Sequence, residues 1–280
     1  MGKGKPDAAV AFSAIASPLV DSAVEQARHI AREPAAEGIH QLRVALRNLL
    51  TLWWLYRPLM GAEEYARQRG CLKSIAGAAG KARDYDILIE LLSRHDKCSA
   101  AGIAAIYVAR EAALQAGREI LSPPHIQTCL LKTLTQTEAR LRAKPRQLRL
   151  GALAEARIAK SRRQLHQRIK RAITANKPDI EAFHDVRKAG KKTRYLLELF
   201  EPLLPKDHHR LLKRLKKIQQ PLGELNDLAA SESLLRQNLR LISTPDQAKK
   251  LERWLKRKRK RRQNTLACSL RQDWQPKRPG

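Results

Sequence analysis

The chain has 280 residues, of which 56 are Lys or Arg and 27 are Asp or Glu, so its formal net charge at pH 7 is +29. Its hydrophobic content of 43% is too high for a disordered basic tail, and a chain of this length can bury a sizeable core. No stretch approaches 18 uninterrupted apolar residues, which argues against a membrane-spanning segment. A globular protein with this charge should bind a polyanion.

The charge is concentrated in the second half of the chain. Residues 1–140 carry 18 basic and 14 acidic side chains, whereas residues 141–280 carry 38 and 13. Charging for solubility alone would not need this asymmetry. We therefore expect the C-terminal half to be the stronger anion-binding half.

The cysteines and the N-terminal segment indicate the cellular compartment of the protein. Cys71, Cys98, Cys129 and Cys268 lie far apart without CxxC spacing, which fits free thiols in a reducing compartment better than a zinc site or a disulfide framework. The N-terminal 20 or so residues have some signal-peptide character, but Asp7 interrupts it and the apolar pattern continues at helical spacing, which favours a first helix. We expect a cytoplasmic protein without a bound metal or cofactor.

The sequence predicts an all-α protein. Strong helix formers dominate, alternating β-branched runs are absent, and prolines such as Pro34, Pro145 and Pro221 separate apolar-periodic segments. The expected helices cover about 8–32, 37–57, 62–79, 84–96, 101–121, 126–142, 152–175, 180–200, 207–220, 223–241 and 246–265.

An internal repeat relates the two parts of the chain. At an offset of 144 residues, His40 and Arg43 align with His184 and Arg187, and Arg47 falls on Lys191. Further along, at an offset of 143, Gly80 aligns with Gly223 and Asp84 with Asp227. Two homologous helical halves, about 8–145 and 150–265, are the economical explanation.

Each half contains a helix with a cationic stripe. The first stripe consists of His40, Arg43 and Arg47, spaced i, i+3 and i+7. The second consists of His184, Arg187, Lys191 and Arg194, spaced i, i+3, i+7 and i+10, which fall within an arc of about 80°. No carboxylate interrupts either stripe, and unpaired cations at this spacing repel one another unless an anion binds. Solvated basic faces and half-buried structural histidines are the alternatives. The recurrence of the pattern in both halves favours binding.

Four segments carry a resemblance to a known family. They read HQLRVALR at 40–47, GKARDYD at 80–86, HDVRKAGKKTRY at 184–195 and LGELNDL at 222–228. In this order, over roughly residues 8–265, they resemble the CHAD family, the conserved histidine α-helical domain. The sequence departs from the family after Arg47, where Asn48-Leu49-Leu50 replaces further arginines and shortens the first stripe.

The resemblance implies a fold and a function. Residues 1–280 would form a single CHAD domain, a duplicated bundle of two pseudo-symmetric four-helix halves around a central basic channel, with a basic tail at 266–280. Such a domain binds inorganic polyphosphate and is not an enzyme. The ExExK signature of the triphosphatase domain that often accompanies it is absent, so the chain resembles the binding module alone.

Within this interpretation, arginines supply forked phosphate donors, lysines supply point charges, and histidines add charge when protonated, so binding should strengthen on acidification. The predicted polyphosphate-binding residues are His40, Arg43, Arg47, Lys73, Arg83, His184, Arg187, Lys188, Lys191, Arg194, Lys216 and Lys217. Asp84 and Asp227 each follow a break that contains glycine, so we expect them to cap helices, or to orient a basic side chain.

Other functions remain possible from the sequence. A non-specific RNA or DNA binder would share the charge, but aromatic residues make up only 4% of the chain and mostly lie outside the basic runs. A phosphate-processing enzyme usually has a phosphate-binding glycine loop or converging carboxylates, and neither pattern is present. A polyphosphate-granule scaffold would overlap with the binding role. The run Lys256–Arg262 is a helix end, a nucleic-acid tail or an extension of the phosphate surface.

Overall fold

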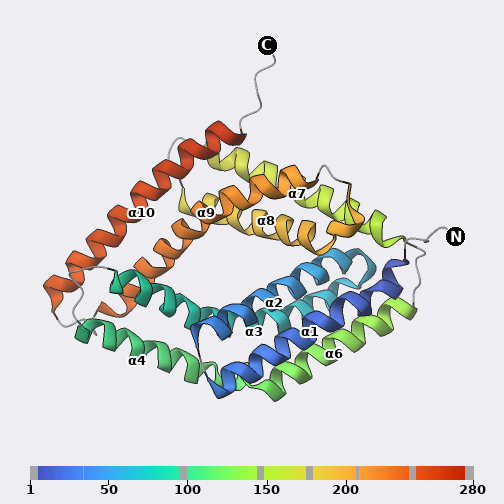
Figure 1. The fold of residues 1–280 in the computed structure, drawn as a ribbon, viewed down its shortest axis with the longest axis horizontal. Helices are drawn as coiled ribbons and strands as arrows, with labels where there is room; N and C mark the ends of the chain where they lie inside the picture. The colour runs from blue at the N-terminus through green and yellow to red at the C-terminus, as the bar shows by residue number, and fades with distance from the viewer. Residues whose placement is uncertain are drawn as a thin grey trace, which may run out of the picture. The chain divides into compact units, whose positions relative to one another are not determined.

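The computed structural model describes residues 6–33, 35–94, 100–143, 148–174, 179–205, 208–239 and 244–274. Within these residues all the regular structure is helical, which confirms the all-α prediction (Figure 1). The helices are α1 (Ala8–Arg32), α2 (Ala36–Tyr56), η1 (Arg57–Leu59), α3 (Ala62–Ser93), α4 (Ala100–Ala116), α5 (Arg118–Leu121), α6 (Pro123–Ala143), α7 (Leu150–Thr174), α8 (Ile180–Leu199), η2 (Glu201–Leu203), α9 (His208–Gln237) and α10 (Pro245–Trp274).

Two predicted helix breaks are absent. Helix α3 runs unbroken through Gly80, and α9 runs unbroken through Pro221. Leu215, Leu222 and Leu225 are buried on both sides of this proline, and their packing outweighs the cost of about 3 kcal/mol that proline imposes inside a helix.

Asp84 and Asp227 therefore lie inside helices, and the expectation that they cap helices is wrong. Capping aspartates occur elsewhere in the chain. Asp7 Oδ1 accepts a hydrogen bond from Ala9 N at 2.8 Å, and Asp179 Oδ1 accepts one from Glu181 N at 3.0 Å. These two carboxylates fix the starts of α1 and α8.

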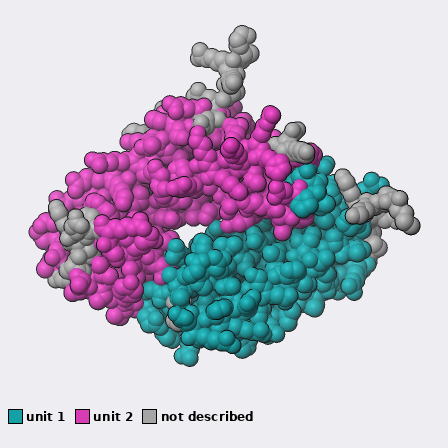
Figure 2. All heavy atoms as spheres, in the orientation of Figure 1, with its two compact units in different colours: residues 1–83, 110–157, 202–204 teal, residues 84–109, 158–201, 205–280 magenta. Residues whose placement is uncertain are grey.

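The chain divides into two compact units (Figure 2). Unit 1 contains residues 1–83, 110–157 and 202–204, and unit 2 contains residues 84–109, 158–201 and 205–280. Each unit takes segments from both predicted sequence halves, so the units of packing are not the same segments as the halves 8–145 and 150–265. The duplication itself stays a prediction from the sequence alignment.

The core of unit 1 forms where α1 packs against α2 and α6. The ring of Phe12 meets the rings of Trp53 and Tyr56 edge to face, at centroid distances of 5.1 and 4.9 Å. The Tyr56 hydroxyl donates to Ala8 O at 2.7 Å, and Trp53 Nε1 donates to Gln68 Oε1 at 2.9 Å. These contacts hold α2, which carries the first cationic stripe, against α1 and α3.

Helix α1 is long enough and apolar enough to cross a membrane, judged by length and composition alone. The sequence-based argument against any such segment is therefore too strong, because it required an uninterrupted apolar run. A buried core helix and a signal sequence pass the same test. In this structure Phe12, Val20 and Ala23 of α1 are buried.

A disulfide joins α3 to α6 within unit 1. Cys71 and Cys129 are bonded, with their Cα atoms 6.6 Å apart, so the expectation of free thiols is wrong for this pair. Cys268 is a free, exposed thiol, and Cys98 lies outside the described residues. Because disulfides persist mainly in oxidising compartments, the cysteines no longer support the cytoplasmic prediction.

The core of unit 2 forms where α9 packs against α8 and α10. Leu228 and Leu235 of α9 share one apolar cluster with Leu251 and Leu255 of α10. Glu232, only 5% exposed, forms ion pairs with Arg236 and Arg259.

The basic run Lys256–Arg262 lies within α10, so it is neither a frayed helix end nor a tail. Two of its side chains face inward, because Arg259 pairs with Glu232 and Arg262 pairs with Glu224. Helix α10 also continues through residues 266–274 of the predicted tail, where Leu266 and Leu270 are buried.

A candidate anion-binding groove on helices α8 and α9

Helix α8 has one buried face and one polar face. Phe183, Val186 and Leu197 are buried, and the helix packs against α9. The helical period then leaves Arg187, Lys191 and Arg194 half-buried beside that face. The spacing predicted from the sequence therefore yields a shared edge of cations on α8.

An open groove of about 520 Å³ runs between this edge and α9. Four cations and two carboxylates line it. Its described lining consists of Arg187, Lys191, Arg194, Lys216, Gln219, Gln220, Gly223, Glu224 and Asp227. Five predicted residues are thus brought together here, namely Arg187, Lys191, Arg194, Lys216 and Asp227.

A carboxylate organises part of the groove, contrary to the expectation of a stripe free of carboxylates. Glu198 Oε1 accepts a hydrogen bond from Arg194 Nη1 at 3.1 Å and lies 3.8 Å from Lys216 Nζ. The Arg194 guanidinium also lies over the ring of Tyr195, 4.6 Å from its centroid. Glu198 thus holds Arg194 within α8 and links α8 to Lys216 of α9.

His184 lies next to the groove but does not line it. Its Nδ1 atom is 2.7 Å from Asn226 Oδ1, so in the neutral ring Nδ1–H donates and Nε2 is left as the acceptor. The ring borders a small apolar hollow of about 240 Å³ together with Phe183 and Leu222.

Burial is the main cause that lowers the pKa of His184 below its ordinary value. The hydrogen bond that His184 donates to Asn226 opposes this shift, while Lys188 and Arg187 add to it. His184 is therefore neutral at neutral pH and gains its charge only on acidification.

Two other predicted residues of the second half lie outside the groove lining. Lys188 is exposed and its Nζ lies 3.7 Å from Asp185, a carboxylate that also lies 3.9 Å from Arg168 Nε. Lys217 is exposed on α9 and does not line the groove. Because Lys188 directly follows Arg187, the helix turns it by about 100° from the edge that lines the groove.

The first predicted stripe forms a separate cationic cluster in unit 1. His40, Arg43 and Arg47 lie on α2, and Arg83 lies on α3. Partial burial, followed by the charge of Arg83, lowers the pKa of His40, and Arg43 and Arg47 contribute in the same direction while Glu37 opposes them. These charges therefore lie around one histidine.

Gly80 leaves space on α3 for the guanidinium of Arg43. A Cβ atom at position 80 would lie 2.9 Å from Arg43 Nη1, so the guanidinium occupies the space that a side chain would need. The glycine of the repeated motif thus makes room for an arginine and does not end a helix. Lys73, the remaining predicted residue of the first half, is exposed on α3.

The sequence analysis missed the side of the groove that α9 provides. Gln219 is 8% exposed, and its Nε2 finds no hydrogen-bond acceptor among the described residues. From Lys216, the residues at +3, +4, +7, +8 and +11 all line the groove. This helical spacing could have predicted a shared face of α9 from the sequence. A search for cations missed it, because most of the residues on this face are glutamine, glycine or glutamate.

Metal-ligand clusters are not found in the described part of the chain. No group of three or more His, Cys, Asp or Glu side chains there is placed to hold a metal ion. The side chains gathered at the groove are mainly hydrogen-bond donors and cations, which suit the oxygen atoms of an anion.

Comparison with known proteins identifies the family. The sequence model of the CHAD domain family matches residues 14–236, which is most of the chain. The fold is similar to the crystal structure of the CHAD domain from the plant Ricinus communis, with a TM-score of 0.80 and 21% identity over 95% of this chain and 92% of that chain. No curated protein matches the sequence significantly. The family match and the shared helical fold agree, and the chain belongs to the CHAD family.

Proposed function

We propose that this chain binds inorganic polyphosphate, without catalysing a reaction, in the groove between α8 and α9. The observation that carries the proposal is the convergence of Arg187, Lys191, Arg194 and Lys216 on one open groove of about 520 Å³. Polyphosphate carries about one charge per unit and no other functional group, so its recognition depends on the spacing of cations and phosphate donors.

The groove residues suit different parts of this task. The guanidinium groups of Arg187 and Arg194 offer forked donors that match phosphate oxygens, and Lys191 and Lys216 supply compact charges. Gln219 adds a buried amide donor that lacks an acceptor among the described residues. Glu198 pairs with Arg194 and Lys216 at the groove, so it competes with a bound phosphate for these two cations.

The carboxylates of the groove act in the opposite direction. Glu224 and Asp227 line it and repel an anion, although Glu224 is partly neutralised by its ion pair with Arg262 of α10. This arrangement favours an extended chain that contacts the cations of α8 over a single compact anion at the centre of the groove. The cluster around His40 would supply a second, weaker contact region.

Nucleic acid is the main alternative ligand, and the lining of the groove disfavours it. None of its nine described lining residues is aromatic. Trp53, Tyr56 and Tyr195 are buried, so they are not free to stack with bases. Binders of single strands usually combine cations with exposed aromatic rings.

Calorimetric titration with long-chain polyphosphate tests the proposal. The double variant Arg187→Ala/Lys191→Ala should bind at least about tenfold more weakly, because charge-assisted hydrogen bonds contribute about 1.5–3 kcal/mol each. The control Lys256→Ala/Arg257→Ala removes the same charge from exposed positions on α10. Equal losses in the two variants would refute a specific groove.

The salt dependence provides a second readout of the same experiment. With about 6–10 phosphates neutralised, the affinity should fall roughly 10³–10⁵-fold between about 50 and 200 mM salt, by analogy with DNA. A flat response would mean few ionic contacts and a different ligand. Association with polyphosphate granules would follow from such binding and stays a prediction.

A further inference from the structure

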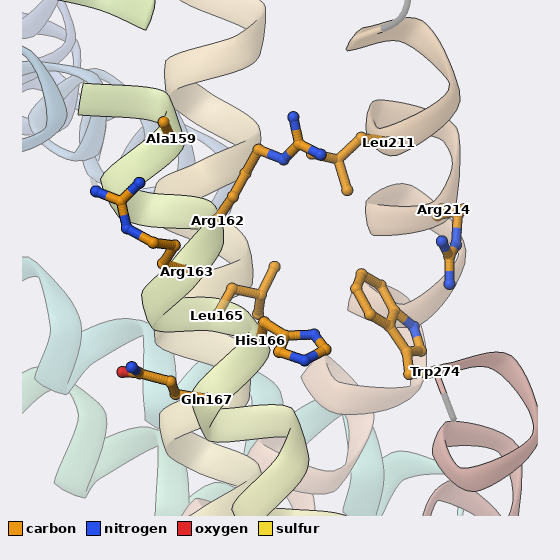
Figure 3. A pocket seen from close by; sticks show the side chains of 9 residues that line it. All are labelled: Ala159, Arg162, Arg163, Leu165, His166, Gln167, Leu211, Arg214 and Trp274. Carbon is orange, nitrogen blue, oxygen red and sulfur yellow. The ribbon is translucent and has the colours of Figure 1, made fainter. Parts of the chain in front are cut away.

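A second pocket, separate from the groove, lies in unit 2 between α7, α9 and the end of α10. Its volume is about 690 Å³, within the range of small-molecule sites. Its described lining consists of Ala159, Arg162, Arg163, Leu165, His166, Gln167, Leu211, Arg214 and Trp274 (Figure 3). It shares no residue with the lining of the α8–α9 groove.

The lining combines cations with an apolar wall. Arg162, Arg163 and Arg214 contribute positive charge, and none of the nine described lining residues is acidic. Leu211 and the Trp274 indole provide apolar surface, and Leu165 is buried beneath the lining. A polyphosphate chain has no apolar part and would leave this wall unused, whereas the α8–α9 groove has no such wall.

Arg214 contacts the Trp274 ring. The Arg214 guanidinium lies 4.3 Å from the centroid of the indole, a cation–π contact that holds the ring in place. Figure 3 shows the indole between Arg214 and the side chains of α7, with Leu165 and His166 on the far side of the ring from Arg214. Trp274 therefore lines the pocket together with side chains of α7.

Of the three arginines, Arg162 extends across the pocket toward α9. In Figure 3 the side chain of Arg162 extends from α7 toward Leu211, across the pocket, while Arg163 and Gln167 point away from Trp274. Arg162 and Arg163 are exposed, so their guanidinium groups are accessible from solvent. An arginine fork at this edge is suited to a phosphate group.

We propose that this pocket binds a small organic phosphate that carries a flat aromatic ring, such as a nucleoside diphosphate. The ring would stack on the Trp274 indole beside Leu211, and the phosphates would bind Arg162. Stacking on an aromatic side chain and phosphate binding by arginine each contribute modestly, so both parts of the ligand are needed.

Calorimetric titration with three probes tests this combination. ADP carries both parts, pyrophosphate carries only the charge, and adenosine carries only the ring. The wild-type chain should bind ADP at least about tenfold more tightly than either fragment, since stacking alone is worth about 1–3 kcal/mol. Pyrophosphate binding as tightly as ADP would overturn the proposal.

Variants locate the site. Arg162→Ala and Trp274→Leu should each weaken ADP binding about tenfold, and the control Arg257→Ala, on an exposed part of α10 outside the pocket, should not. Because Arg162 is exposed, its replacement tests the site even if Trp274→Leu destabilises the fold. Unchanged ADP affinity in Arg162→Ala would refute the assignment.

Two further readouts separate this proposal from the polyphosphate groove and from nucleic acid. The variant Arg187→Ala/Lys191→Ala should keep its ADP affinity while losing polyphosphate affinity. A short single-stranded oligonucleotide should not displace ADP at equal phosphate concentration. Displacement would mean that the pocket binds nucleic acid, and loss of ADP binding in the groove variant would mean that the two sites are one polyanion surface.

Discussion

Neutralising Glu198 should strengthen the binding of polyphosphate while slightly destabilising the protein. Glu198 forms ion pairs with Arg194 at 3.1 Å and with Lys216 at 3.8 Å, and both cations line the groove. The substitution Glu198→Gln keeps the size of the side chain and removes its charge. It releases two cations for the ligand and removes one repulsive charge.

The size of the effect follows from Coulomb's law. A phosphate bound to the two cations would lie roughly 6 Å from the Glu198 carboxylate, and an effective dielectric constant of about 20 to 80 gives a repulsion of about 0.7–2.8 kcal/mol. Removing it should raise the affinity about threefold to a hundredfold. The Arg194 and Glu198 side chains are 23% and 31% exposed, and losing such a pair should cost about 1 kcal/mol or less in the free energy of unfolding.

Titration of polyphosphate, with urea denaturation in parallel, measures both effects. The control Glu252→Gln changes the net charge equally, but it removes the partner of Arg236 on a different part of unit 2. The control should alter the affinity far less than Glu198→Gln does. Unchanged or weaker binding in Glu198→Gln, or an equal gain in the control, would refute the account of the groove.

Three further predictions concern the halves of the chain, pH and the disulfide. The variant Arg43→Ala/Arg47→Ala should lose less polyphosphate affinity in titrations than Arg187→Ala/Lys191→Ala, and equal losses would contradict the asymmetry. Because the pKa of His184 is lowered in the folded state, the stability that its neutral form contributes is present above about pH 6.5 and is lost as the pH falls through the folded pKa. Polyphosphate affinity should instead rise as the pH falls over the same range. In titrations at several pH values, His184→Gln should flatten this rise, and the exposed control His125→Gln should not. Replacing Cys71 and Cys129 by Ser should lower the free energy of unfolding by about 2–4 kcal/mol in denaturation curves, because their bond closes a long loop, whereas Cys268→Ser should change it little.

Amphipathic helices were the part of the fold that could be predicted from the sequence. The period of buried residues such as Phe183, Val186 and Leu197 defines α8 and places its cations on the neighbouring face. Helix breaks were harder to predict, because Gly80 and Pro221 are locally ambiguous. Packing on a neighbouring helix carries α9 through Pro221, and the glycine in α3 makes room for Arg43.

Contacts between distant segments could not be predicted from spacing. Cys71 and Cys129 are 58 residues apart and become neighbours only because α3 and α6 lie side by side there. The ion pair between Glu198 and Lys216 depends in the same way on how α9 packs against α8, whereas the pair of Glu198 with Arg194 is an i,i+4 contact within α8. Lys188 lies outside the groove lining and near Asp185, three residues earlier, and its role in binding stays a prediction.

A competition titration at about 150 mM salt, close to physiological ionic strength, tests the central claim most directly. Labelled long-chain polyphosphate bound to the protein is challenged with tRNA and with single-stranded DNA at equal phosphate concentration, using the wild type and Arg187→Ala/Lys191→Ala. The account predicts that neither nucleic acid displaces polyphosphate until it is in large excess, and that the variant loses the binding. One-for-one competition by RNA, with normal binding in the variant, would show that the charge of +29 acts as a general polyanion surface.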